Sequence, residues 1–201
     1  MLTNEIIVSL IKDLLVVAVV PAILVYVFSN YKEFKKQNEE RLSVLNALRA
    51  ELSSLDMLIC SREEQFLKCA SEGFNSTYYP YIAITLNYFS VFDNLSSKFG
   101  LINNQDAIEQ IIKCYSEVKG LFDDVKNLEY YAKMIVNPRC LANVNQSQND
   151  ALINNYHLNL EGIVNVQLPK AKILIKQSVQ CIDKEKNKIE SKNTVFGFLF
   201  G

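Results

Sequence analysis

The sequence predicts an all-α protein in which an N-terminal transmembrane helix continues into an antiparallel bundle of about four helices. Three observations support this prediction. Only 6 Gly and 4 Pro occur among 201 residues, a scarcity that favours long helices. A strongly apolar stretch occupies residues 6–28, and apolar residues then recur at helical spacing along most of the chain. We divide the chain into a membrane anchor (1–29), a bundle (30–192) and an apolar tail (193–201).

The apolar stretch, IIVSLIKDLLVVAVVPAILVYVF, has the length of a membrane span. At 1.5 Å per residue it reaches about 34 Å, whereas the hydrocarbon core of a bilayer measures about 30 Å. A cleavable signal peptide is the rival interpretation. It would have a basic start and a small-residue cleavage site, but the chain begins MLTNE and no such site follows. We therefore expect an uncleaved, single-pass anchor that crosses the bilayer.

The charges flanking the span predict its orientation. No Lys or Arg precedes it, whereas Lys32, Lys35, Lys36 and Arg41 follow it. Basic residues stay on the cytoplasmic side, so we expect the N-terminus outside and the bundle in the cytoplasm. Five Cys without a C-x-x-C pair fit free thiols in a reducing compartment.

Three residues of the span are candidates for a membrane role. Lys12 and Asp13 either lie at the outer interface, where Lys12 extends towards water, or line a pore or a subunit contact. Pro21 is expected to kink the helix, because proline lacks the N–H that a helix interior uses.

The bundle begins with a leucine-rich stripe that continues the first helix. Its apolar residues recur at intervals of three and four: Leu45, Leu48, Leu52, Leu55 and Ile59, continuing through Arg62 to Phe66. No Gly or Pro interrupts residues 22–72. Such a stripe fits either a coiled coil or packing inside a bundle, and we favour the bundle because the later segments need a partner too.

Three further helices are predicted. The second runs from about Tyr81 to Phe99 and stops at Gly100; its uncharged start leaves a re-entrant membrane segment as an alternative. The third begins after Asn103 or Asn104 and ends before Pro138. The fourth is capped by Asn149 or Asp150, and Pro169 should kink or split it.

Two surfaces are candidates for contacts. The turn after the first helix carries Phe74, Tyr78 and Tyr79, and exposed aromatic rings suit a protein partner or cover the end of the bundle. The tail carries Phe196, Phe198 and Phe200 behind a Lys-rich stretch. This combination predicts an anchor at the membrane interface, with folding into a groove of the bundle as the alternative.

Catalytic chemistry is not indicated. The one His, His157, has no partner set for nucleophilic or metal chemistry, and neither a phosphate-binding loop nor an H-E-x-x-H motif occurs. We expect no enzyme, no cofactor and no metal. The net charge of −1 also excludes the electrostatic signature of a nucleic-acid binder.

A span, a basic stretch and a helix containing LNALRAEL follow one another over residues 6–70, an arrangement that resembles many bacterial membrane-anchored helical proteins. From this arrangement, together with the orientation predicted from the flanking charges, we expect a single-pass protein of a bacterial inner membrane. The expected function is an anchored interaction or sensor module, with the bilayer and an unidentified protein as partners. The alternative is a homo-oligomer that perturbs the membrane or forms a pore.

Overall fold

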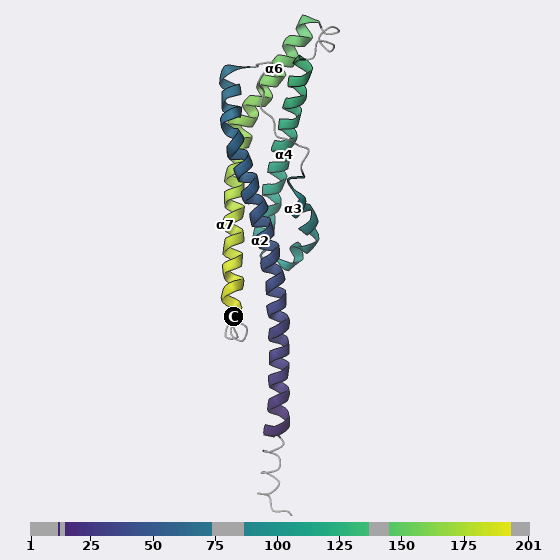
Figure 1. Ribbon diagram of the computed structural model, residues 1–201, viewed down its shortest axis with the longest axis vertical. Coiled ribbons are helices and arrows are strands. Elements are labelled where there is room, and N and C mark those ends of the chain that lie inside the picture. Colours follow the sequence, from purple (N-terminus) through teal and green to yellow (C-terminus); the bar gives the residue numbers. More distant parts are fainter. Residues whose placement is uncertain (1–11, 13–14, 74–86, 137–144, 194–201) are drawn as a thin grey trace, which may run out of the picture. The chain divides into compact units, whose positions relative to one another are not determined.

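The computed structural model describes residue 12 and residues 15–73, 87–136 and 145–193 (Figure 1). In these ranges the chain is all-α, as predicted. Four α-helices exceed ten residues: α2 (Val20–Glu72), α4 (Gln105–Val136), α6 (Gln146–Gly162) and α7 (Leu168–Lys192). The shorter elements are the π-helices η1 (Leu15–Val19) and η3 (Ile163–Gln167), the α-helix α3 (Ser90–Leu95) and the 3₁₀ helix η2 (Ser96–Leu101).

The chain forms two compact units. One comprises Val44–Glu185, and the other combines Met1–Ser43 with Lys186–Gly201. The first holds the core, where the described helices α4, α6 and α7 lie beside the second half of α2 (Figure 1).

The leucine-rich stripe of α2 forms one wall of that core. Leu48, Leu52 and Ile59 have no exposed surface, while Arg62 is partly exposed. The stripe is therefore buried within a single chain, which confirms packing inside a bundle. The helix ends at Gly73, whose φ of 78° suits a residue without a Cβ and whose N–H donates to the Cys69 carbonyl at 3.1 Å.

The third predicted helix is confirmed in α4. Asn104 begins it, because its side-chain oxygen accepts from the Ala107 N–H at 3.3 Å. The spacing of its apolar residues predicts one buried face, made of Ile108, Ile111, Tyr115, Val118, Phe122, Val125, Leu128, Ala132 and Ile135. Every one of these residues from Ile111 onwards is buried, and Ile108 is partly exposed. The helix contacts α6 and η3.

The second predicted helix, Tyr81–Phe99, is wrong in its described part. Residues 87–89 are not helical, because the Asn87 side chain accepts from the Phe89 N–H at 3.1 Å and holds the chain in a local turn. The six-residue helix α3 then starts afresh at Ser90, and η2 replaces the expected α-helix from Ser96 onwards. Gly100 lies inside η2 and is not a left-handed cap.

The fourth predicted helix begins earlier than expected. Asn145, not Asn149 or Asp150, is its N-cap: its side chain accepts from the Gln148 N–H at 2.9 Å. The Gln148 side chain accepts from the Asn145 N–H in return at 3.0 Å, which completes a capping box.

Pro169 splits this helix, as predicted, into α6 and α7. The two are joined by η3, and the Leu168 N–H bonds five residues back to the Ile163 carbonyl. In a regular α-helix the ring of Pro169 would clash with the carbonyl of Asn165, four residues earlier. Asn165 lies within η3, where the turn of the π-helix is wider. The same arrangement occurs at Pro21, since η1 ends two residues before it and contains Val17, the residue four positions back.

Candidate functional site

The N-terminal helix presents an apolar surface that the rest of the chain leaves uncovered. In the described part of the chain, the helix starting at Val16 is the one that is long and apolar enough to cross a membrane. Its best window has a mean hydropathy of 1.3, and none of that window is buried. Val17 and Val25, for example, are 75% and 70% exposed. This composition fits the predicted span.

The three predicted membrane residues of this region have different outcomes. Lys12 is helical and exposed, and Pro21 is exposed within the first turn of α2. Asp13 lies outside the described residues.

A polar junction joins the end of α7 to α2 just beyond the apolar stretch. The Asn38 side-chain amide donates to the side-chain oxygen of Asn193 at 2.9 Å, and the Tyr31 hydroxyl donates to the Asn193 carbonyl at 3.2 Å. Asn38 is 2% exposed, so its hydrogen bond is shielded from water. All three residues belong to the unit that combines Met1–Ser43 with Lys186–Gly201.

This junction fixes where the apolar tail starts. Asn193 is the one described residue of the tail (193–201), and Tyr31 follows Phe28, the last residue of the apolar stretch, by three positions. Phe196, Phe198 and Phe200 themselves lie outside the described residues. The described start of the tail therefore lies beside the part of α2 that directly follows the apolar stretch.

A buried carboxylate holds α3 in place. The two oxygens of Glu51 accept from the Val91 N–H at 2.7 Å and the Phe92 N–H at 3.0 Å, at the start of α3. The Tyr115 hydroxyl donates to the same carboxylate at 2.8 Å. Burial, together with the hydrogen bond to Glu51, raises the pKa of Tyr115, so its hydroxyl remains a donor at neutral pH.

Aromatic rings surround this carboxylate. Phe92 stacks on Tyr115 with 4.0 Å between ring centroids, and Phe89 meets Phe122 edge-on at 5.3 Å. The Lys119 ammonium lies 5.1 Å from the centre of the Phe92 ring and pairs with an acidic side chain of α3. Glu51 was not predicted from the sequence, because nothing in its local pattern distinguishes it from the exposed acids of α2.

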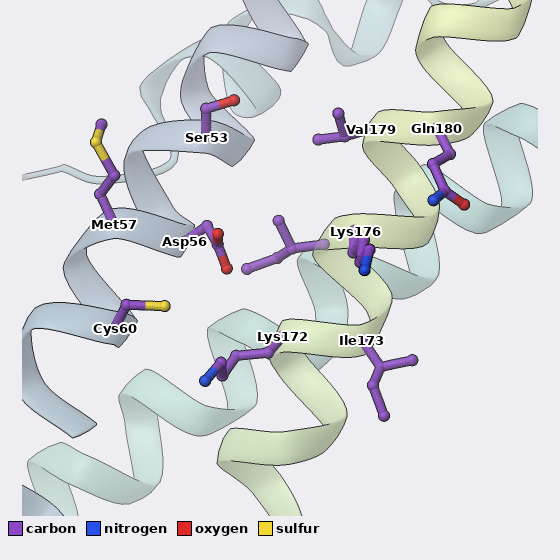
Figure 2. A pocket seen from close by; sticks show the side chains of 10 residues that line it. Ser53, Asp56, Met57, Cys60, Lys172, Ile173, Lys176, Val179 and Gln180 are labelled. Atoms are coloured by element: carbon purple, nitrogen blue, oxygen red, sulfur yellow. The ribbon is translucent and has the colours of Figure 1, made fainter. Parts of the chain in front are cut away.

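A groove runs between α2 and α7 (Figure 2). Its volume is about 610 Å³, and its walls carry Ser53, Asp56, Met57 and Cys60 from α2 and Lys172, Ile173, Ile175, Lys176, Val179 and Gln180 from α7. Asp56 and Cys60 point from α2 towards α7, and Lys172 points back towards α2. Lys172 also pairs with Glu63 at 2.7 Å, a hydrogen bond that raises the pKa of the lysine.

The groups that the sequence offered for chemistry are dispersed. His157 packs edge-on against Tyr156 at 5.7 Å between ring centroids. Cys60, Cys69, Cys114 and Cys181 are free thiols, and burial raises the pKa of Cys114 to about 11. Among the described residues, no three His, Cys, Asp or Glu side chains gather as metal ligands. The predicted contact residues Phe74, Tyr78 and Tyr79 lie outside the described ranges.

Comparison with protein-family models, curated proteins and solved structures finds no match to this chain. The functional argument therefore depends on the surfaces described above.

Proposed function

We propose that the protein is a membrane-anchored helical interaction module, held in a bacterial inner membrane by one span with its bundle in the cytoplasm. The observation that carries this proposal is the apolar N-terminal stretch, which is long enough to span and of which no part is buried among the residues that the structure describes. In water this surface would be a large aggregation-prone patch, whereas in a bilayer it is solvated by lipid.

The polar junction supports a second attachment to the same membrane. Since Asn193 is bonded beside the start of the cytoplasmic stalk, the tail that follows it emerges close to the bilayer surface. Lys32, Lys35 and Lys36 are exposed on the neighbouring turn of α2, where they would face anionic headgroups. We expect Phe196, Phe198 and Phe200 to enter the membrane–water interface there. The chain would then be attached to the membrane both before and after the bundle.

A membrane-perturbing or pore-forming oligomer is the second candidate, because Lys12 is helical and exposed within the apolar stretch of residues 6–28. The two functions differ in what Lys12 and Asp13 do. Replacing both with Leu should leave an anchored module in the membrane and able to be crosslinked to its partner. The same change should abolish the activity of a pore, since a polar lining would be lost.

The discriminating experiment induces the wild type and the Lys12→Leu/Asp13→Leu variant and records the membrane potential of the cells. We expect neither protein to depolarise them, and equal recovery of crosslinked partners from both. Depolarisation by the wild type alone would contradict the anchored-module proposal.

A further inference from the structure

The groove between α2 and α7 lies at the centre of a stripe of polar and charged side chains. On α2 the stripe is Arg49, Ser53, Asp56, Cys60 and Glu63, spaced alternately by four and three residues, so its members lie on one helical face. On α7 the polar members are Lys172, Lys176 and Asp183, and the apolar Val179 completes the same kind of spacing. Because the two helices are antiparallel, the charged residues of α2 and of α7 lie at three shared levels, the middle one of which Figure 2 shows.

Ion pairs at the two ends of the stripe define these levels. Arg49 pairs with Asp183 at 2.7 Å, and Glu63 pairs with Lys172 at 2.7 Å. These two levels therefore carry opposite charges on the two helices.

The middle level follows the same rule. Asp56 lies halfway between the two paired residues of α2, and Lys176 lies near the midpoint of the corresponding segment of α7. The two side chains line the groove from opposite walls (Figure 2). Two apolar side chains, Met57 and Ile173, are 66% and 56% exposed on the outer edges of these walls.

We propose that this α2–α7 face is a homodimer interface, in which a second copy of the chain packs its own α2–α7 face against it around a twofold axis parallel to the helices. Such an axis places α2 of one copy opposite α7 of the other and keeps every residue at its level. Asp56 of each copy then faces Lys176 of the other. Because the three charged levels carry opposite charges within one chain, they are also complementary between two chains.

The charges also exclude the other way of joining the same faces. A twofold axis perpendicular to the helices within the interface would place α2 on α2 and α7 on α7. Asp56, near the centre of the face, would then meet the second Asp56, and the like charges would oppose association. Packing around the axis parallel to the helices instead covers Met57 and Ile173 and closes the groove between the four helices.

A charge-reversal experiment on the full-length protein in detergent micelles tests this interface. Donor- and acceptor-labelled copies of the wild type should show energy transfer that disappears on dilution. Asp56→Lys places Lys opposite Lys176 twice per dimer, and Lys176→Glu places Glu opposite Asp56 twice. Each variant alone should therefore self-associate at least about tenfold more weakly than the wild type.

Association of the two variants with each other is the decisive measurement. In a heterodimer, Lys at position 56 faces Glu at position 176, and the native Asp56 and Lys176 face each other at the second contact. Association of the mixture should return to the wild-type level. Lys113→Glu and Asp123→Lys reverse exposed charges on α4, outside the groove, and should change nothing.

Three results would overturn the proposal: a wild type that is monomeric at every concentration, energy transfer that neither groove variant weakens, or a mixture that associates no better than each variant alone. Recovery in the mixture also shows that both variants are folded. A change in helix content alone therefore cannot be mistaken for loss of the interface.

Discussion

Replacing Glu51 with Ala should lower the free energy of unfolding of the protein by about 3–5 kcal/mol. The change removes the shared acceptor of three buried or partly buried donors, the N–H groups of Val91 and Phe92 and the hydroxyl of Tyr115. A donor left unpaired in a protein interior costs about 1–3 kcal/mol. The measurement is denaturant unfolding of the full chain in detergent, followed by circular dichroism and by the fluorescence of the tyrosines.

Two variants control this prediction. Glu64→Ala removes an exposed carboxylate from the same helix and should change stability by no more than about 0.5 kcal/mol. Tyr115→Phe removes one donor and leaves the acceptor with two partners, so its cost should be near 1 kcal/mol. If Glu51→Ala cost no more than Glu64→Ala, the carboxylate would not be what holds α3 against the bundle.

Deleting residues 194–201 from a protein that lacks residues 1–29 should weaken its binding to anionic vesicles about 100-fold. Full burial of one large apolar side chain is worth roughly 1.5–3 kcal/mol. Half-insertion of Phe196, Phe198 and Phe200 together therefore supplies about 2–4 kcal/mol, and each 1.4 kcal/mol changes affinity about tenfold. Sedimentation of the protein with vesicles measures the change.

The matched control keeps the length of the tail and replaces the three Phe with Ser. It should bind as weakly as the deletion, because the apolar side chains and not the chain length supply the affinity. If the protein without residues 194–201 bound vesicles as well as the protein with its tail, the tail would pack against the bundle and would not attach it to the membrane.

The sequence predicted those elements whose signals are local. The limits of α4 follow from the cap at Asn104 and from Pro138 beyond its end, and its core face follows from the spacing of its apolar residues. Pro169 likewise marked the interruption between α6 and α7 through a local clash with its own helix. The lack of a C-x-x-C pair predicted free thiols, and the four Cys that the structure describes are free.

The start of the fourth helix was wrong although its capping box, Asn145 with Gln148, is local. The wrong prediction for the second helix depended in part on a partner distant in the sequence. The start of α3 is determined by Glu51, 40 residues before Val91, so no window around Ser90 could reveal it. The helix predicted over Tyr81–Phe99 was bounded by Gly100, but Asn87 and Glu51 together impose a turn and a new start within it. The groove was also missed, because its two walls are separated by more than a hundred residues of chain.

Cys60 offers the most direct measurement of the central claim, that one span holds the bundle on the cytoplasmic side of the membrane. Its thiol is exposed on α2, whereas Cys69 and Cys114 are buried with raised pKa values. In the Asp56→Lys variant, whose groove no second copy should cover, a membrane-impermeant maleimide should fail to label Cys60 in intact cells and should label it in inverted membrane vesicles, with Cys60→Ser identifying the labelled site. Labelling of Cys60 in intact cells, or recovery of the protein in the soluble fraction, would contradict the account.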